Sequence, residues 1–113
     1  SPDGERALAS VLVPSGGGER YEIHAIDLET GESWSLMLEE GRYASEAPFA
    51  PRIGATSEDD GYLVSFIIDE NRGTSECVLI DARDIEAGPV CRIALPHKIS
   101  SGTHSWWADR AQL

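Results

Sequence analysis

Three histidines are the side chains in this 113-residue chain most able to bind a metal or move a proton. A neutral imidazole offers one ring nitrogen with a lone pair for either task. His24 lies in an alternating, strand-like pattern and is expected to be half-buried or solvent-facing. His97 follows a proline and is expected on a surface loop. His104 lies among small, flexible residues before Trp106-Trp107. No Cys or carboxylate stands at zinc-finger spacing from His104, so spacing alone leaves its role open.

Glu46 is a single carboxylate in an apolar segment held by prolines, 45–52. A solvated side chain is the default interpretation of such a glutamate. The apolar surroundings favour a specific partner instead, because an unpaired buried charge is costly. The tandem Trp106-Trp107 fits a pocket lining or simple packing equally well.

Other acidic and glycine-rich segments carry no recognisable chemistry. The run that starts at Asp69 has Ile80 at the twelfth position, where a calcium-binding EF-hand loop requires Glu, so a hairpin turn is expected there. The acidic run 58–61 is likewise expected to be a turn before a strand. Neither a phosphate-binding glycine loop nor a local signature of a Ser/His/Asp triad is present.

Composition limits the class of partner and the compartment. The chain has 20 acidic and 9 basic residues and a net charge of −11, which argues against nucleic acid or an anionic membrane surface as a partner. The longest strongly apolar run, Leu63–Ile68, is far shorter than the roughly 20 residues of a membrane helix. Cys77 and Cys91 lie among apolar residues and are expected to be free, buried thiols, with a disulfide bond across adjacent strands as the alternative. Free thiols favour a reducing, cytoplasmic compartment.

The chain begins without Met, on residues that read as the inside of a turn, and shows no signal peptide. We therefore expect it to be the end of a longer protein.

The elements that must position these side chains are strands. Short β-rich runs are separated by turn residues, and no window has helical periodicity. The long stretch 41–61 is expected to be irregular. This pattern predicts an all-β chain, as a sandwich, a barrel or a propeller, and the blocks 7–38 and 62–95 could each form most of a four-stranded propeller blade. The expected strands are 7–13, 21–28, 33–38, 62–69, 75–81 and 90–95.

From about Gly41 to Trp107 the sequence closely resembles the C-terminal region of the carotenoid cleavage oxygenases, a family that includes lignostilbene dioxygenases and the retinoid isomerase of the visual cycle. The resemblance is looser over 21–38. It is carried by an ordered series of segments: Ser45-Glu46-Ala47-Pro48-Phe49-Ala50-Pro51-Arg52, Gly54-Ala55-Thr56, Glu58-Asp59-Asp60-Gly61-Tyr62-Leu63, Leu79-Ile80-Asp81-Ala82-Arg83-Asp84, Ala87-Gly88-Pro89-Val90, Leu95-Pro96-His97-Lys98 and Gly102-Thr103-His104-Ser105-Trp106.

The resemblance implies that 1–113 is the C-terminal segment of a seven-bladed β-propeller made of antiparallel blades. It implies a non-haem Fe(2+) held by four histidines. It also implies an enzyme that uses O2 to cleave a conjugated or interphenyl alkene into two carbonyl products. His104 matches the last of the four ligands, and Glu46 matches a glutamate that orients a ligand imidazole. Neither His24 nor His97 matches a ligand motif. The other three ligands are expected on propeller blades upstream of this chain.

Three positions depart from the pattern of the family. Ala47 stands where Pro is usual, Thr103 where Phe is usual, and Ser105 where Gly is usual. The ligand and the carboxylate are kept, so the departures bear on pocket shape and on the choice among carotenoid, apocarotenoid and stilbene substrates. Family members often take substrate from lipid through apolar patches, and no such patch is evident here. The alternatives to an enzyme are a non-catalytic propeller fragment that binds an apolar ligand or protein partner, and a structural β-domain that kept the scaffold and lost activity.

Overall fold

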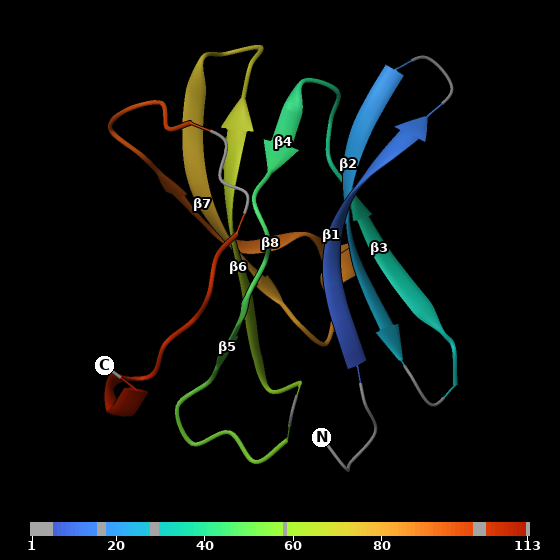
Figure 1. Cartoon of the computed structure of the whole chain (residues 1–113), viewed down its shortest axis with the longest axis vertical. Helices are drawn as coiled ribbons and strands as arrows, with labels where there is room; N and C mark the ends of the chain where they lie inside the picture. The colour runs from blue at the N-terminus through green and yellow to red at the C-terminus, as the bar shows by residue number, and fades with distance from the viewer. Residues whose placement is uncertain (1–5, 16–17, 28–29, 58, 101–103, 113) are drawn as a thin grey trace.

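Two antiparallel β-sheets lie side by side in the computed structural model of the chain (Figure 1). The structure describes residues 6–15, 18–27, 30–57, 59–100 and 104–112. The first sheet has the order β1-β2-β3, formed by Arg6–Ser15, Gly18–Asp27 and Ser33–Met37. This confirms the strands expected across block 7–38.

The second sheet has the order β4-β6-β7-β8, and β5 also pairs with β6. Each pairing is antiparallel, and the β7–β8 register shifts between Leu79 and Ile80. The strands are β4 (Arg42–Ala44), β5 (Phe49–Pro51), β6 (Gly61–Asp69), β7 (Thr74–Asp81) and β8 (Pro89–Ala94).

Two expectations about local structure were wrong. The stretch 41–61 is not wholly irregular, because β4 and β5 each pair three residues with β6. β1 also runs through Pro14, which pairs with Glu19. A proline is tolerated there because β1 is an edge strand of its sheet, so its missing N–H leaves no partner strand unsatisfied.

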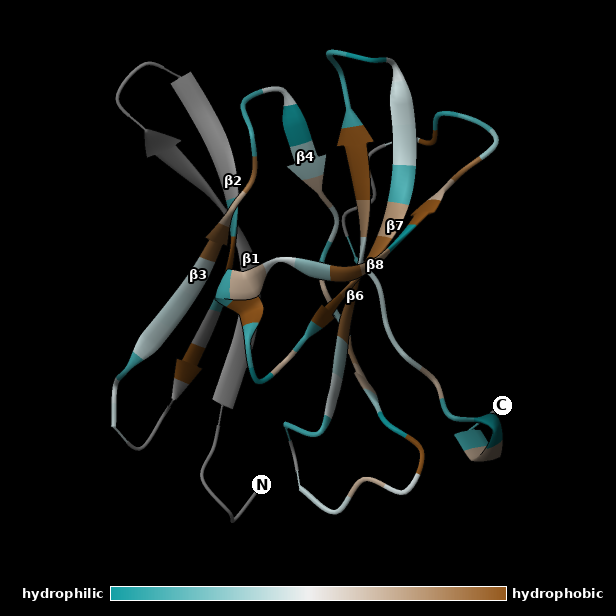
Figure 2. Ribbon diagram, turned by 180° about the vertical axis from the view of Figure 1, so that it is seen from behind, coloured by the Kyte–Doolittle hydropathy of each residue, from teal (hydrophilic) through white to brown (hydrophobic). Residues whose placement is uncertain are grey.

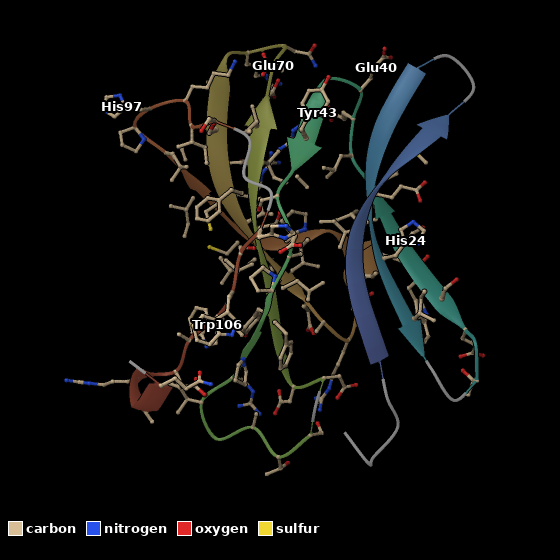
Figure 3. The ribbon with its side chains drawn as sticks, in the orientation of Figure 1. His24, Glu40, Tyr43, Glu70, His97 and Trp106 are labelled. Carbon is tan, nitrogen blue, oxygen red and sulfur yellow. The ribbon has the colours of Figure 1, made fainter. Side chains whose placement is uncertain are left out.

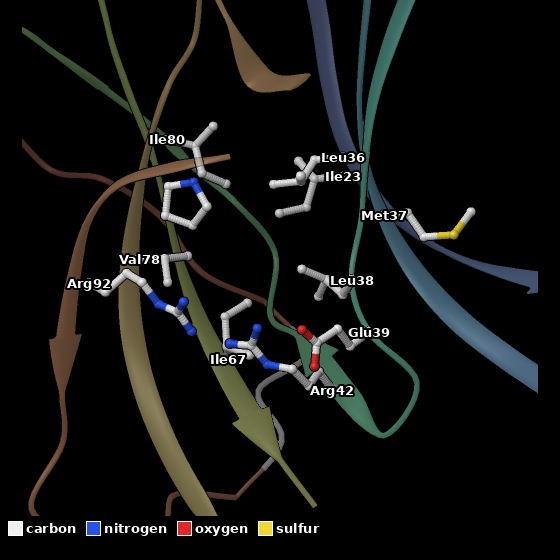
Figure 4. A pocket seen from close by; sticks show the side chains of 11 residues that line it. Ile23, Leu36, Met37, Leu38, Glu39, Arg42, Ile67, Val78, Ile80 and Arg92 are labelled. Carbon is white, nitrogen blue, oxygen red and sulfur yellow. The ribbon is translucent and has the colours of Figure 1, made fainter. Parts of the chain in front are cut away.

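The hydrophobic core fills the space between the two sheets. Figure 2 shows hydrophobic segments on β3, β6 and on the short turn η1 (Ile85–Ala87). A cavity of about 160 Å³ remains in this space, with apolar walls from both sheets and with Arg42, Arg92 and Glu39 at one end (Figure 4). The buried core residues are Ile23, Leu38, Leu63, Ile67, Val78, Ile80, Ala82 and Ile85.

Helical structure in the described residues is confined to two three-residue 3-10 turns, η1 and η2 (Arg110–Gln112). None of these described helices is long and apolar enough to cross a membrane. Both cysteines are free thiols, as expected. Cys77 is half-buried and Cys91 is exposed, so the expectation that both are buried was wrong for Cys91. The reason is that β8 is an edge strand whose six residues are all exposed.

A glycine fixes the start of β4 against the β6–β7 hairpin. Gly41 has a φ of +85°, and a Cβ at this position would lie 2.6 Å from side-chain atoms of Asn71. Only glycine combines this backbone conformation with such a close approach. The Asn71 side chain donates a hydrogen bond to the Glu40 carbonyl at 2.8 Å, and the Glu70 amide donates to the Gly41 carbonyl at 2.9 Å.

A row of charged side chains holds β4 across the width of the second sheet. Both Arg42 on β4 and Arg92 on β8 donate to the Glu76 carboxylate on β7, Arg92 at 2.6 Å and 3.1 Å. The Arg92 hydrogen bonds, and then the charges of both arginines, lower the pKa of Glu76 from its usual 4.5. β4, which enters the segment that carries Glu46, is therefore fixed at both its backbone and its first side chain.

Candidate functional site

The candidate site is built on a break in the edge strand of the second sheet. Ala44 is the last β4 residue paired with β6, opposite Ile67, and pairing resumes with Phe49 opposite Leu63. Residues 45–48 therefore face only residues 64–66, so four residues oppose three. One extra residue in an antiparallel pair is a β-bulge, which re-aims a side chain locally. Glu46 is inside this bulge.

Ser45 keeps the bulge attached to the sheet. Its backbone N–H donates to the Phe66 carbonyl at 2.9 Å, and its hydroxyl oxygen accepts from the Phe66 N–H at 3.0 Å. The side chain thus replaces the backbone acceptor that a regular ladder would supply. The fully buried Ser65 donates to the Ser45 carbonyl at 3.1 Å, and the Val64 N–H donates to the Pro48 carbonyl at 3.1 Å, where the ladder resumes.

The bulge places the neighbouring side chains of Glu46 and Ala47 in different environments. Ala47 packs against the core between the sheets, whereas Glu46 reaches the segment that follows β8. His104 Nδ1 lies 2.9 Å from one carboxylate oxygen, Oε1. The Ser105 N–H donates to the other, Oε2, also at 2.9 Å. The structure therefore brings together the two residues that the sequence singled out, which are 58 positions apart.

The electrostatics assign the proton in this pair. The Ser105 amide and then the His104 ring lower the pKa of Glu46 from its usual 4.5. An ionised carboxylate only accepts hydrogen bonds, so His104 must donate from Nδ1–H. In the neutral form of the ring, this tautomer has its lone pair on Nε2. The His104 side chain is 87% exposed in this chain, so the ring is accessible.

The other two histidines lie elsewhere, as expected. His24 is half-buried on β2, where its ring contacts the carboxylate of Glu22, and His97 is exposed on the loop after β8. Figure 3 shows them on opposite sides of the molecule. Trp106 is 73% exposed and Trp107 is 44% exposed, so neither indole is part of the described core.

Sequence reasoning missed the part that serines play at this site. Ser105 appeared only as a departure from the family pattern, and Ser45 only as the residue before Glu46. Serines placed directly before Glu46 and directly after His104 were the available signal, but serine is common in loops and this signal is weak. Thr103, the other departure beside His104, lies outside the described residues.

His104 is the candidate metal ligand in the described part of the chain. His104 offers Nε2, a neutral nitrogen of the kind that suits Fe(2+), with its tautomer fixed by a carboxylate. No group of three or more His, Cys, Asp or Glu side chains clusters within the described residues. The residues present fit one corner of a metal site and do not make a complete one.

Two antiparallel sheets that share a core, with an exposed edge strand, fit either a β-sandwich or neighbouring blades of a β-propeller. The sequence profile described as "Retinal pigment epithelial membrane protein" matches residues 11–109. The chain belongs to this family, the carotenoid cleavage oxygenases. The chain is 41% identical over 103 residues to carotenoid 9,10(9',10')-cleavage dioxygenase 1 of Arabidopsis thaliana, an alignment that covers 83% of this chain and 19% of the relative.

Solved structures confirm the fold class. Cobalt-substituted apocarotenoid oxygenase of Synechocystis has a TM-score of 0.73 at 30% identity, over 90% of this chain and 22% of that one. Lignostilbene dioxygenase of Pseudomonas brassicacearum has a TM-score of 0.71 at 31% identity, over 77% and 18%. These relatives are seven-bladed β-propellers, and the chain has their antiparallel blade architecture. It spans about a fifth of their length.

Proposed function

We propose that this chain is the C-terminal propeller segment, 1–113, of a non-haem Fe(2+)-dependent dioxygenase. The whole protein cleaves a conjugated alkene bond of an apolar polyene or stilbene with O2 and gives two carbonyl products. His104 supplies the last of four histidine ligands, and Glu46 orients it. The other three ligands come from propeller blades upstream.

One observation carries this proposal: the hydrogen bond between Glu46 Oε1 and His104 Nδ1 at 2.9 Å. A histidine that binds a metal through one nitrogen needs an acceptor for the proton on the other nitrogen. Glu46 meets this need, and it explains why a carboxylate occupies a bulge whose next residue packs in the core. A solvated glutamate would require neither the bulge nor the contact.

In this proposal the residues of this chain bind the metal and orient its ligand; they do not themselves react with the substrate. Glu46 keeps the proton on Nδ1, so that Nε2 stays free for the metal, and its negative charge makes the imidazole a stronger donor. When bound, the iron supplies the activation of O2, and one oxygen atom goes to each carbonyl product. A neutral ring in this tautomer presents Nε2 to the metal without a proton shift between its two nitrogens.

The relatives indicate the range of substrates. Their names refer to carotenoids, apocarotenoids and lignostilbenes, all of which carry an alkene conjugated to an apolar framework. The proposal includes this class of substrate for the whole protein. The cytoplasmic location and the absence of a nucleic-acid partner stay predictions from composition. The sequence leaves open whether this protein, like other family members, contacts a membrane to collect its substrate.

The experiment is to express the full-length protein with His104→Ala and, as a matched control, His97→Ala. Cleavage is measured on a stilbene and on an apocarotenoid under 18O2, with mass spectrometry of both products. We expect label in both carbonyl products of the wild type, near-normal turnover for His97→Ala and loss of turnover for His104→Ala. Full activity of His104→Ala, or greater damage from His97→Ala, would refute the site.

The non-catalytic alternative makes a different prediction. A propeller that only binds an apolar ligand or a protein partner would be folded and iron-free, and would yield no labelled carbonyl product. The upstream sequence alone distinguishes the enzyme from the non-catalytic propeller, since the enzyme requires three further histidines on separate strands.

A further inference from the structure

A serine hydroxyl beside the candidate ligand adds a second connection between the blade and the segment after β8. The Ser105 Oγ–H donates to the backbone carbonyl of Glu46 at 3.2 Å. This bond is separate from the Ser105 N–H bond to the Glu46 carboxylate. Ser105 therefore contacts Glu46 at both its main chain and its side chain.

The same carbonyl also accepts a hydrogen bond from a second serine. The Ser45 Oγ–H also donates to it, at 2.9 Å. Ser45 belongs to the sheet through its bonds to Phe66 and Ser65, whereas Ser105 belongs to the segment that carries His104. The Glu46 carbonyl thus joins the rigid blade to the ligand-bearing segment through two hydroxyls.

We infer that Ser105 is a positioning residue for the metal site, in that its hydroxyl holds the His104 segment in register with Glu46. The inference rests on the proposed function, because it assigns the metal to His104 Nε2. A ligand must be held within a fraction of an ångström of its productive place. The hydrogen bond that the His104 ring donates to the Glu46 carboxylate leaves the backbone of the ligand free to shift. The Ser105 hydroxyl restrains that backbone at the adjacent residue.

The hydroxyl has little to do for folding. The Glu46 carbonyl keeps the Ser45 hydroxyl as a donor when the Ser105 hydroxyl is removed, so no acceptor is left bare. Ser105→Ala also keeps the backbone N–H that binds the Glu46 carboxylate. The variant should therefore unfold like the wild type and differ mainly in how well it holds a metal.

The test measures Co2+ binding by the metal-free full-length protein, through the ligand-field absorption bands and their titration. The variants are Ser105→Ala, Ser105→Thr and His104→Ala, with Ser35→Ala at an exposed position of β3 as the control. We expect Ser105→Ala to weaken Co2+ binding about two- to tenfold, the range that one hydrogen bond supplies, and to alter the absorption bands. Ser105→Thr should restore the Co2+ affinity and the absorption bands. The unfolding midpoint of metal-free Ser105→Ala should equal that of the wild type.

Failure of this inference and failure of the proposed function have different signatures. Unchanged Co2+ affinity and spectrum in Ser105→Ala, while His104→Ala loses binding, overturn the role of Ser105 alone. Weaker binding with a lowered unfolding midpoint and no restoration by threonine assigns the serine to folding and overturns it too. Co2+ binding that survives in His104→Ala refutes the proposed function itself.

Discussion

Glu46→Gln removes the charge of the carboxylate and keeps its shape. In the native structure each carboxylate oxygen accepts one hydrogen bond, Oε1 from His104 and Oε2 from Ser105. An amide has only one oxygen, so one of these two donors must face an NH2 group.

Both orientations of the amide weaken the site. If the amide oxygen accepts from the Ser105 N–H, the NH2 group faces His104 Nδ1. That nitrogen must then accept, and the proton moves to Nε2, the nitrogen proposed for the metal. If the oxygen faces His104 instead, the NH2 group and the Ser105 N–H are two donors in contact, which repel. The second orientation keeps the tautomer and loses the hydrogen bond from the Ser105 N–H, while the Ser105 hydroxyl keeps its bond to the backbone carbonyl.

The expected cost is a loss of about 10- to 100-fold in metal affinity, which is typical when the hydrogen-bond partner of a ligand histidine is removed. The assay is iron or Co2+ titration of the full-length variant, together with its unfolding midpoint. Glu86→Gln, at an exposed position in η1, makes the same charge change away from the site and serves as the control. Metal affinity of Glu46→Gln equal to that of Glu86→Gln would refute the reasoning.

Two further predictions concern the fold. The isolated segment 1–113 should aggregate or fold only loosely and hold no stoichiometric iron, because all six residues of the edge strand β8 are exposed, with Val90 at 59% and Ile93 at 49%. A monomeric elution profile with a cooperative melt and one bound iron would contradict this. The lowered pKa of Glu76 means that its bonds to arginine stabilise the fold above pH 4.5, its usual value, and lose this effect as the pH falls below it. Glu76→Gln should therefore lower the melting temperature at neutral pH, and the variant and the wild type should melt at more similar temperatures in acid. A difference in melting temperature that does not change with pH would contradict this prediction.

The strands of the fold could be predicted from the sequence, because residues such as 62–69 and 75–81 combine β-branched side chains with clear turns on either side. β4 and β5 could not, since each pairs only three residues and the segment between them contains a bulge and prolines. The stability of these two strands comes from contacts distant in sequence, such as Gly41 against Asn71.

The candidate site divides in the same way. Glu46 could be singled out because a charge in an apolar loop requires a partner, and His104 because it matched a family pattern. Their hydrogen bond could not be derived, because it joins two segments 58 residues apart through a bulge that only the pairing with β6 defines. Ser105 was noted as a departure, and its contacts with Glu46 became evident only in three dimensions.

The central claim is that His104 is a metal ligand oriented by Glu46, and iron content tests it most directly. Full-length wild type, His104→Ala and His97→Ala are purified in parallel under anaerobic conditions with added Fe(2+), and the iron per protein molecule is measured after removal of loosely bound metal. The account predicts about one iron for the wild type and for His97→Ala, and almost none for His104→Ala. Equal iron in all three proteins, with intact folding, would contradict it.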